Sequence, residues 1–215
     1  MRFADRRQAG ARLGRAVAAH DPLFPLVAAL PRGGVPVGFE VAEALGCDLD
    51  VLVVRKIGVP FHPELAMGAV AEGGVVIRNQ EIIDAARIDE PTFRARAETE
   101  RAELEARLAV YREAAPAIEP KGRTVVVVDD GLATGSTALA AVSALQAREA
   151  RAVWLAVPVA PPEVVPAMSG ATDRLIVLEQ PRRFLAVGAW YDDFSPTSDA
   201  EVVALLERSR RRSGH

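Results

Sequence analysis

The sequence predicts an α/β protein with three layers, α/β/α, around a mostly parallel, twisted sheet. Short apolar segments alternate with segments of helical spacing along the 215 residues, a pattern typical of repeated β-then-α units. The clearest unit begins with the valine run Val125–Val128, which predicts a strand buried on both faces. Half of the residues are hydrophobic, so a sizeable core is available to a single domain over residues 1–215.

The N-terminal part of the chain predicts a helix followed by two short strands. Residues 6–19 mix apolar and charged residues at helical spacing, which indicates an amphipathic helix. The apolar run 26–30 predicts a buried strand, and the helix expected over 35–45 ends at Gly46, a favourable C-terminal residue. A second strand is expected over 49–54, ending at Arg55 and Lys56.

The middle of the chain predicts a connection, a hairpin and a long helix. Residues 57–79 begin as a turn-rich connection and end as a hairpin, in which 66–71 and 75–78 flank a Glu-Gly-Gly turn. Residues 88–115 alternate Glu and Arg at i,i+3 and i,i+4 spacing, which predicts a long charged helix with a structural role. Because glutamates interleave with its arginines, this helix is not interpreted as a nucleic-acid patch.

The C-terminal part completes the sheet. A helix is expected from Ala138, followed by a buried strand over 152–157 that Pro158 ends. A short helix within 163–168 and a strand over 172–178 come next. The basic tail Arg208–Arg212 is interpreted as a frayed helix end.

Two carboxylates and a loop of small residues follow the valine strand. Residues 134–137, Thr-Gly-Ser-Thr, offer consecutive backbone N–H groups at a helix N-terminus, which suits a phosphate. No lysine follows the glycine, so the loop is not a Walker A motif. Asp129 and Asp130 suit a ligand that also carries hydroxyls, or a bound metal. A sugar 5-phosphate suits both the loop, through its phosphate, and the carboxylates, through its hydroxyls.

Other cationic groups are expected at the same edge of the sheet. The strand over 26–30 leads into Pro31-Arg32-Gly33-Gly34, which joins a guanidinium and two glycines to a helix N-terminus. Arg55 and Lys56 would face the same crevice, because the carboxyl ends of parallel strands lie together. Solvated charges at a strand end are the alternative for this pair.

The stretch VVVVDDGLATGST, residues 125–137, resembles the ribose-5-phosphate loop of the type I phosphoribosyltransferases, in its adenine-type version. An ordinary strand–turn–helix with an acidic N-cap is the alternative. The resemblance implies that Asp129 and Asp130 hold the ribose hydroxyls of phosphoribosyl pyrophosphate (PRPP) and bind Mg²⁺. It implies that the 5-phosphate is bound by Ala133, Thr134, Gly135, Ser136 and Thr137. It also implies that the pyrophosphate is contacted by Arg32, Gly33 and Gly34, with Arg55 or Lys56.

In the resembled family a mobile loop closes over PRPP, and residues 57–79 stand in that place. Closure would exclude water from a ribosyl group with cationic character. Glu64 would lie near the incoming base or stabilise the cation, and an exposed loop charge is the alternative. His62 is interpreted as a surface histidine.

Residues 181–197 are expected to form a small hood on the base side. Residues 184–194 gather aromatic rings and two carboxylates, which suit a planar heterocycle. They loosely resemble the V-G-x-x-x-D segment of the hypoxanthine-guanine enzymes, through Val187, Gly188 and Asp192. The base-binding candidates are Phe184, Val187, Trp190 and Asp192, and a core role is the alternative for the aromatic rings.

The resemblance implies a phosphoribosyltransferase of nucleotide metabolism that joins PRPP to a nitrogenous base, a purine or pyrimidine, and releases pyrophosphate. The catalytic candidates are Asp129, Asp130, Arg32 and Glu64. The 6-oxopurine enzymes carry an Asp where this chain has Ala133, and a lysine after the next strand that is absent here, so the acceptor base stays open. The alternatives are a non-catalytic PRPP or nucleotide-binding regulator on the same fold, and a hydrolase or phosphorolytic enzyme.

Composition points to a cytoplasmic protein without nucleic-acid or membrane partners. A homo-oligomer, in the form of a dimer, is also expected. The net charge of −3 gives no reason to expect binding to nucleic acid or to an acidic membrane surface. No apolar run is long enough to span a bilayer, and the N-terminus lacks an apolar signal core. The single cysteine, Cys47, suits a reducing compartment and is expected to be a small buried residue.

Overall fold

The computed structural model describes residues 2–213, except for the side chains of residues 63, 64 and 213. Its centre is a five-stranded sheet in which all neighbouring strands are parallel. In spatial order the strands are β2 (Asp48–Val51), β1 (Pro25–Ala29), β6 (Thr124–Val128), β7 (Ala152–Val159) and β8 (Arg174–Glu179). Every residue of the central strand, β6, is buried, as the valine run predicted.

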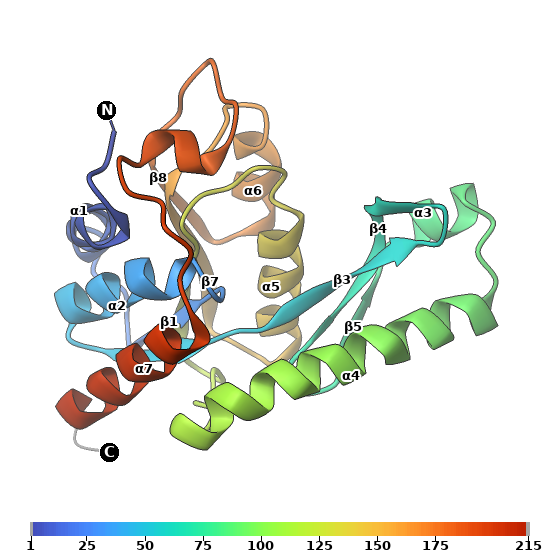
Figure 1. Cartoon of the computed structure of the whole chain (residues 1–215), viewed down its shortest axis with the longest axis horizontal. Coiled ribbons are helices and arrows are strands. Elements are labelled where there is room, and N and C mark those ends of the chain that lie inside the picture. Colours follow the sequence, from blue (N-terminus) through green and yellow to red (C-terminus); the bar gives the residue numbers. More distant parts are fainter. Residues whose placement is uncertain (1, 214–215) are drawn as a thin grey trace.

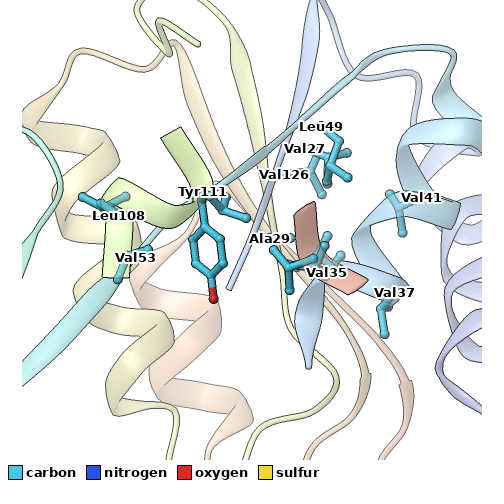
Figure 2. Close-up of a cluster of buried hydrophobic side chains, with 14 of the residues drawn as sticks. Val27, Ala29, Val35, Val37, Val41, Leu49, Val53, Leu108, Tyr111 and Val126 are labelled. Atoms are coloured by element: carbon cyan, nitrogen blue, oxygen red, sulfur yellow. The ribbon is translucent and has the colours of Figure 1, made fainter. Parts of the chain in front are cut away.

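Helices cover both faces of this sheet (Figure 1). Alternate residues point to opposite faces of a strand, so Val126 and Val128 pack with α1 (Arg6–Ala18), α2 (Gly34–Leu45) and α7 (Asp199–Ser213), a core shown in Figure 2. Val125 and Val127 pack with α5 (Ser136–Ala147) and α6 (Val165–Ala171). The predicted α/β/α class is confirmed. None of the described helices is both long and apolar enough to cross a membrane.

A separate antiparallel sheet, β3-β4-β5, projects from the parallel sheet (Figure 1). It consists of β3 (Val54–Val59), β4 (His62–Ala71) and β5 (Val75–Arg78), and α5 packs against all three strands. Two more helices follow it, α3 (Gln80–Ala85) and α4 (Glu90–Ala114), and α4 packs along β3 and β4. We call these three strands and two helices the arm. The hairpin and the long helix are confirmed.

Four details of the expected elements are wrong. The strand predicted over 49–54 ends at Val51, so Arg55 and Lys56 lie inside β3 rather than at the edge of the parallel sheet. The stretch before the hairpin is not turn-rich, because most of it pairs as β3 and β4. Pro158 lies within β7, and the C-terminal tail continues α7 instead of fraying. Whether 57–79 closes over a ligand stays a prediction.

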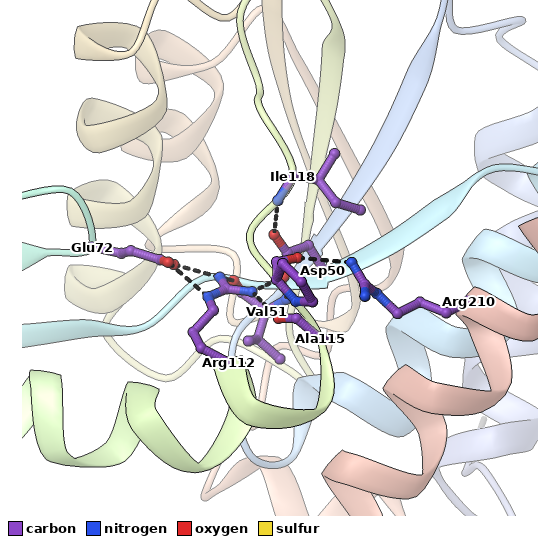
Figure 3. A network of polar contacts seen from close by, with 8 residues as sticks. Asp50, Val51, Glu72, Arg112, Ala115, Ile118 and Arg210 are labelled. Atoms are coloured by element: carbon purple, nitrogen blue, oxygen red, sulfur yellow. Dashed lines mark hydrogen bonds and ion pairs between the residues drawn. The ribbon is translucent and has the colours of Figure 1, made fainter. Parts of the chain in front are cut away.

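A buried ionic network joins the arm to the parallel sheet (Figure 3). The guanidinium of Arg112, near the end of α4, lies 2.5 Å from both Asp50 Oδ1 in β2 and Glu72 Oε2 after β4. It also donates to the carbonyls of Val51 and Ala115, while the second oxygen of Asp50 accepts from the Ile118 N–H. Asp50 is only 6% exposed, so its charge depends on this arginine.

We expect Arg112→Met to lower the free energy of unfolding by about 3–5 kcal/mol, because it leaves a buried carboxylate without its cation. Arg101→Met is the matched control on the same helix, since Arg101 lies 3.7 Å from an exposed Glu98 and should matter little. Urea unfolding of both variants measures the difference. Equal losses would show that the network does not stabilise the fold.

Candidate active site

The carboxylates of Asp129 and Asp130 follow β6 and lie where four segments meet. Asp129 Oδ1 accepts the backbone N–H of Asp130 at 2.8 Å. Asp130 Oδ2 accepts from Arg6 Nε of α1 at 2.9 Å, and both side chains of that pair are largely buried. The ionic contact therefore fixes Asp130 from a helix more than a hundred residues away in the chain.

Both carboxyl groups are harder to ionise than usual. Burial, together with the charge of Asp130, raises the pKa of Asp129 well above its usual value. Burial also raises the pKa of Asp130, although Arg6 opposes the shift. The ionised pair therefore favours a ligand that supplies cations or hydroxyl donors, which is the chemistry expected of a sugar or metal site.

The two carboxylates suit Mg²⁺, which needs few protein ligands, better than a metal ion that is coordinated by protein side chains alone. Carboxylate oxygens are hard ligands, and Mg²⁺ usually keeps several waters and binds through one or two carboxylates. Arg6 engages one oxygen of Asp130 and a backbone N–H engages one of Asp129, so each side chain has a second oxygen. The described residues contain no cluster of three or more potential metal-ligating side chains, so substrate or water would complete the shell.

The loop after the acidic pair forms a small cradle at the start of α5. Gly135 is the N-cap with φ of +74°, and a Cβ there would lie 2.7 Å from Met168 Cε. Gly135 supplies no side-chain acceptor to the first N–H groups of the helix, which suits an anion, although the Ser136 N–H donates to Thr134 Oγ1 at 3.4 Å. A cavity of about 180 Å³ runs along the loop, lined by Asp129, residues 131–138 and Val187. The predicted cradle residues, 133–137, all line it.

The Arg32-Gly33-Gly34 loop touches the acidic pair, as expected for two loops at one edge of the sheet. A Cβ on Gly33 would lie 2.1 Å from Asp130 Oδ2, and one on Gly34 would lie 2.7 Å from the Val128 carbonyl oxygen. Only glycine permits this approach. The Arg32 guanidinium is half-exposed, 3.8 Å from Asp199 of α7.

Arg55 and Lys56 lie apart from these loops, in β3. The Arg55 Nε donates to Glu100 of α4 at 2.7 Å, and its guanidinium also contacts Glu103. Lys56 has no carboxylate partner among the described residues. It lines a second cavity together with Thr137, the last residue of the cradle loop. The contribution of either cation to ligand binding stays a prediction.

Residues 184–194 reach the site only in part. Val187, in the 3₁₀ turn Val187–Trp190, lines the cradle, and it packs so closely that a Cβ on Gly131 would lie 2.6 Å from its Cγ1. Asp192 is exposed and lies 3.8 Å from Arg2. Phe184 and Trp190 are half-buried, and neither lines the cradle. The side chain of Glu64 lies outside the described residues.

Two residues that sequence reasoning missed complete the site. Tyr191 donates its hydroxyl to the Asp130 carbonyl at 2.6 Å and is buried. Arg6 also donates to the Ser195 carbonyl at 2.8 Å, and its guanidinium lies 3.9 Å from the centre of the Phe194 ring. Nothing in the sequence distinguishes Arg6 from other arginines of an amphipathic helix, whereas Tyr191 stood within the expected base-side segment.

Comparison with known proteins identifies relatives of the whole chain. A family model described as a phosphoribosyl transferase domain matches residues 21–170. Two curated proteins of Mycobacterium tuberculosis, strains CDC 1551 and H37Rv, are 44% identical to this chain over 209 residues, 97% of its length. Both are named, provisionally, as phosphoribosyl transferases. The chain spans about half of their length, 47%.

Solved structures match the fold. A protein from Thermus thermophilus, known from a crystal structure, is 43% identical, with a TM-score of 0.91 over 97% of this chain and 99% of that one. A protein from Aquifex aeolicus is 12% identical, with a TM-score of 0.51 over 85% of this chain and 78% of its own. The second likeness concerns the fold alone.

We expect Asp129→Asn to stabilise the protein at pH 8 but not at pH 4. A carboxyl whose pKa is raised by folding contributes stability that is lost as the pH rises through the folded value, and asparagine has no such loss. Urea unfolding at both pH values measures the effect, with Asp84→Asn, an exposed position on α3, as the control expected to change little. A variant less stable than the parent at pH 8 would contradict the proposed burial cost.

Proposed function

The chain belongs to the type I phosphoribosyltransferase family, and from this premise we propose that it transfers the 5-phosphoribosyl group of PRPP to a nitrogenous base and releases pyrophosphate. One observation carries the proposal for this site. Asp129 lines the cradle at the start of α5, and the Arg32-Gly33-Gly34 loop lies against the acidic pair, with Gly33 next to Asp130. These loops supply carboxylate acceptors for hydroxyls, a helix N-terminus for a phosphate and, from Arg32, a cation, which supports PRPP as the ligand.

The residues of this surface have separable roles in the proposed reaction. The backbone N–H groups of residues 134–137 bind the 5-phosphate at the positive end of α5. Asp129 and Asp130 accept hydrogen bonds from the ribose hydroxyls and offset cationic character at the anomeric carbon. Arg32 stabilises negative charge that grows on the departing pyrophosphate.

Mg²⁺, held by Asp129 and Asp130, would neutralise the leaving group when it is bound. The surrounding protein keeps the pair ready for such a ligand. Arg6 and the Tyr191 hydroxyl hold Asp130 at two points, its carboxylate and its carbonyl. The carboxylates are thereby oriented before substrate arrives, so binding does not have to order them.

The acceptor is proposed to be a planar base that enters beside Val187. This side chain lines the cradle and belongs to the segment with the aromatic rings. Ala133 supplies no carboxylate inside the loop, so a 6-oxopurine mechanism with a base at that position is not proposed. A homodimer in the cytoplasm remains the expected form.

Pyrophosphate release from PRPP, measured with a panel of purine, pyrimidine and pyridine bases, tests the proposal. Base-dependent release supports transfer, and the responding base names the acceptor. PRPP binding without turnover under every base would identify a non-catalytic regulator instead. Release that needs water alone would indicate a hydrolase. Asp129→Asn/Asp130→Asn should abolish turnover and PRPP binding, whereas the exposed control Asp84→Asn should change neither.

We expect Gly33→Ala to weaken PRPP binding roughly tenfold or more, because the new methyl group displaces either the loop or the Asp130 carboxylate by an ångström or so. Gly170→Ala in α6 is the matched control, since a Cβ there meets nothing within 4 Å. Titration calorimetry with PRPP compares the two. Undiminished affinity in Gly33→Ala would mean that the two loops do not share the ligand.

A further inference from the structure

The side chain of Arg32 is restrained by a residue from the far end of the chain. Its guanidinium lies 3.8 Å from Oδ2 of Asp199, the residue that begins α7. Among the side chains that the structure describes, Asp199 is the carboxylate partner of Arg32, and the guanidinium makes no hydrogen bond. The contact therefore limits where the guanidinium can lie and leaves its N–H groups free to donate to a ligand.

Asp199 is in turn held by the arm. The hydroxyl of Tyr111, in α4, donates to Asp199 Oδ1 at 2.5 Å, so the two oxygens of this carboxylate face different partners. Tyr111 is fully buried, and its ring lies in the core shown in Figure 2. Since side chains in a close-packed core have fixed positions, the hydroxyl is a fixed point for the carboxylate.

The Tyr111 hydroxyl keeps its proton, and so stays a donor, over the working range of pH. Burial, followed by the hydrogen bond to Asp199, raises the pKa of this hydroxyl above its usual value. A hydrogen bond to an ionised carboxylate is also among the stronger kinds in proteins. The orientation of Asp199 is therefore set mainly by the tyrosine rather than by the more loosely held arginine.

The geometry of the Arg32 contact suits positioning better than stabilisation of the fold. Both side chains are about half exposed, and ion pairs of this kind contribute little to stability. A free arginine side chain has many rotamers, so restricting them beforehand lowers the entropic cost of binding. A phosphate oxygen at about 2.8 Å would be preferred to a carboxylate at 3.8 Å, so the restraint does not block the ligand.

We propose that Asp199 and Tyr111 are positioning residues, which hold the Arg32 guanidinium in place for the pyrophosphate group of PRPP. Both act through Arg32 rather than on the ligand. Helix α7 packs against α2, which follows the Arg32 loop, and against α4, so the three side chains connect the arm to that loop. The inference rests on the proposed function for the ligand of Arg32.

Titration calorimetry with PRPP and with ribose 5-phosphate tests the inference, because only PRPP carries a pyrophosphate group. Asp199→Asn and Tyr111→Phe should each weaken PRPP binding about threefold to fivefold, the range expected of a half-exposed ion pair. Neither change should alter the affinity for ribose 5-phosphate. Equal losses for the two ligands would indicate a structural role alone and overturn the inference, as would undiminished PRPP affinity.

Two further variants isolate the contact with Arg32. Glu201→Gln removes an exposed carboxylate from the same first turn of α7, so it measures any general gain from removing negative charge near an anionic ligand. Asp199→Asn should bind PRPP more weakly than this control. In an Arg32→Met background, Asp199→Asn should cause no further loss, because its effect passes through Arg32. A loss of the same size in that background would overturn the inference.

The protein without ligand offers a second readout. The NMR signal of the Arg32 Nε–H group, identified by its loss in Arg32→Met, should be more ordered in the parent than in Asp199→Asn or Tyr111→Phe, on the picosecond to nanosecond scale. Equal order in parent and variants would show that the contact does not restrain Arg32, which also overturns the inference.

These results are distinguishable from a failure of the proposed function. Base-dependent release of pyrophosphate, with parental PRPP affinity in Asp199→Asn and Tyr111→Phe, would remove only the positioning role. PRPP binding that depends on both residues, in a protein without turnover, would leave the positioning role standing and remove the transferase. A parent that does not bind PRPP would remove both.

Discussion

Burial of two adjacent carboxylates at the end of the central strand is the constraint on which the site depends. Asp129 and Asp130 leave water together, and the resulting cost appears as raised pKa values. The protein offsets part of that cost with Arg6, which lies against Asp130. The cost that remains lowers stability at this position, and the proposed ligand would offset it.

The glycines of the neighbouring loop follow from the same constraint. A side chain at Gly33 would collide with the Asp130 carboxylate, and one at Gly34 would collide with the Val128 carbonyl, so the loop after β1 needs glycine at both positions. The Tyr191 hydroxyl in turn donates a hydrogen bond to the Asp130 carbonyl. Segments from both ends of the chain therefore converge on a single aspartate, which couples the base-side segment to the acidic pair.

The arm holds a second set of charged side chains, apart from the acidic pair. Its cations come from β3 and α4, and its attachment to β2 depends on an arginine that neutralises a buried aspartate. The two buried ionic contacts, Arg112 with Asp50 and Arg6 with Asp130, therefore have different roles. The Arg112 network fixes the position of the arm, whereas the Arg6 contact holds a carboxylate of the proposed site.

Local pattern alone was enough to predict the parallel sheet, its flanking helices, the long helix α4 and the small-residue loop at the start of α5. Those features depend on neighbours in the chain: a valine run buries both faces of a strand, and a glycine followed by hydroxyl residues begins a helix. The contact between the Gly33 loop and Asp130 was also predictable, because parallel strands end at a common edge.

Only the tertiary structure decided which charges meet. Arg55 and Lys56 look from sequence like the end of a parallel strand, yet the chain turns away after Val51 and places them on the arm. Arg6 and Asp130 are separated by 124 residues, and no periodicity relates residues so far apart. Helix and strand periods report which face is apolar; the pairing of ions depends on how those faces are packed, and packing is a property of the whole chain.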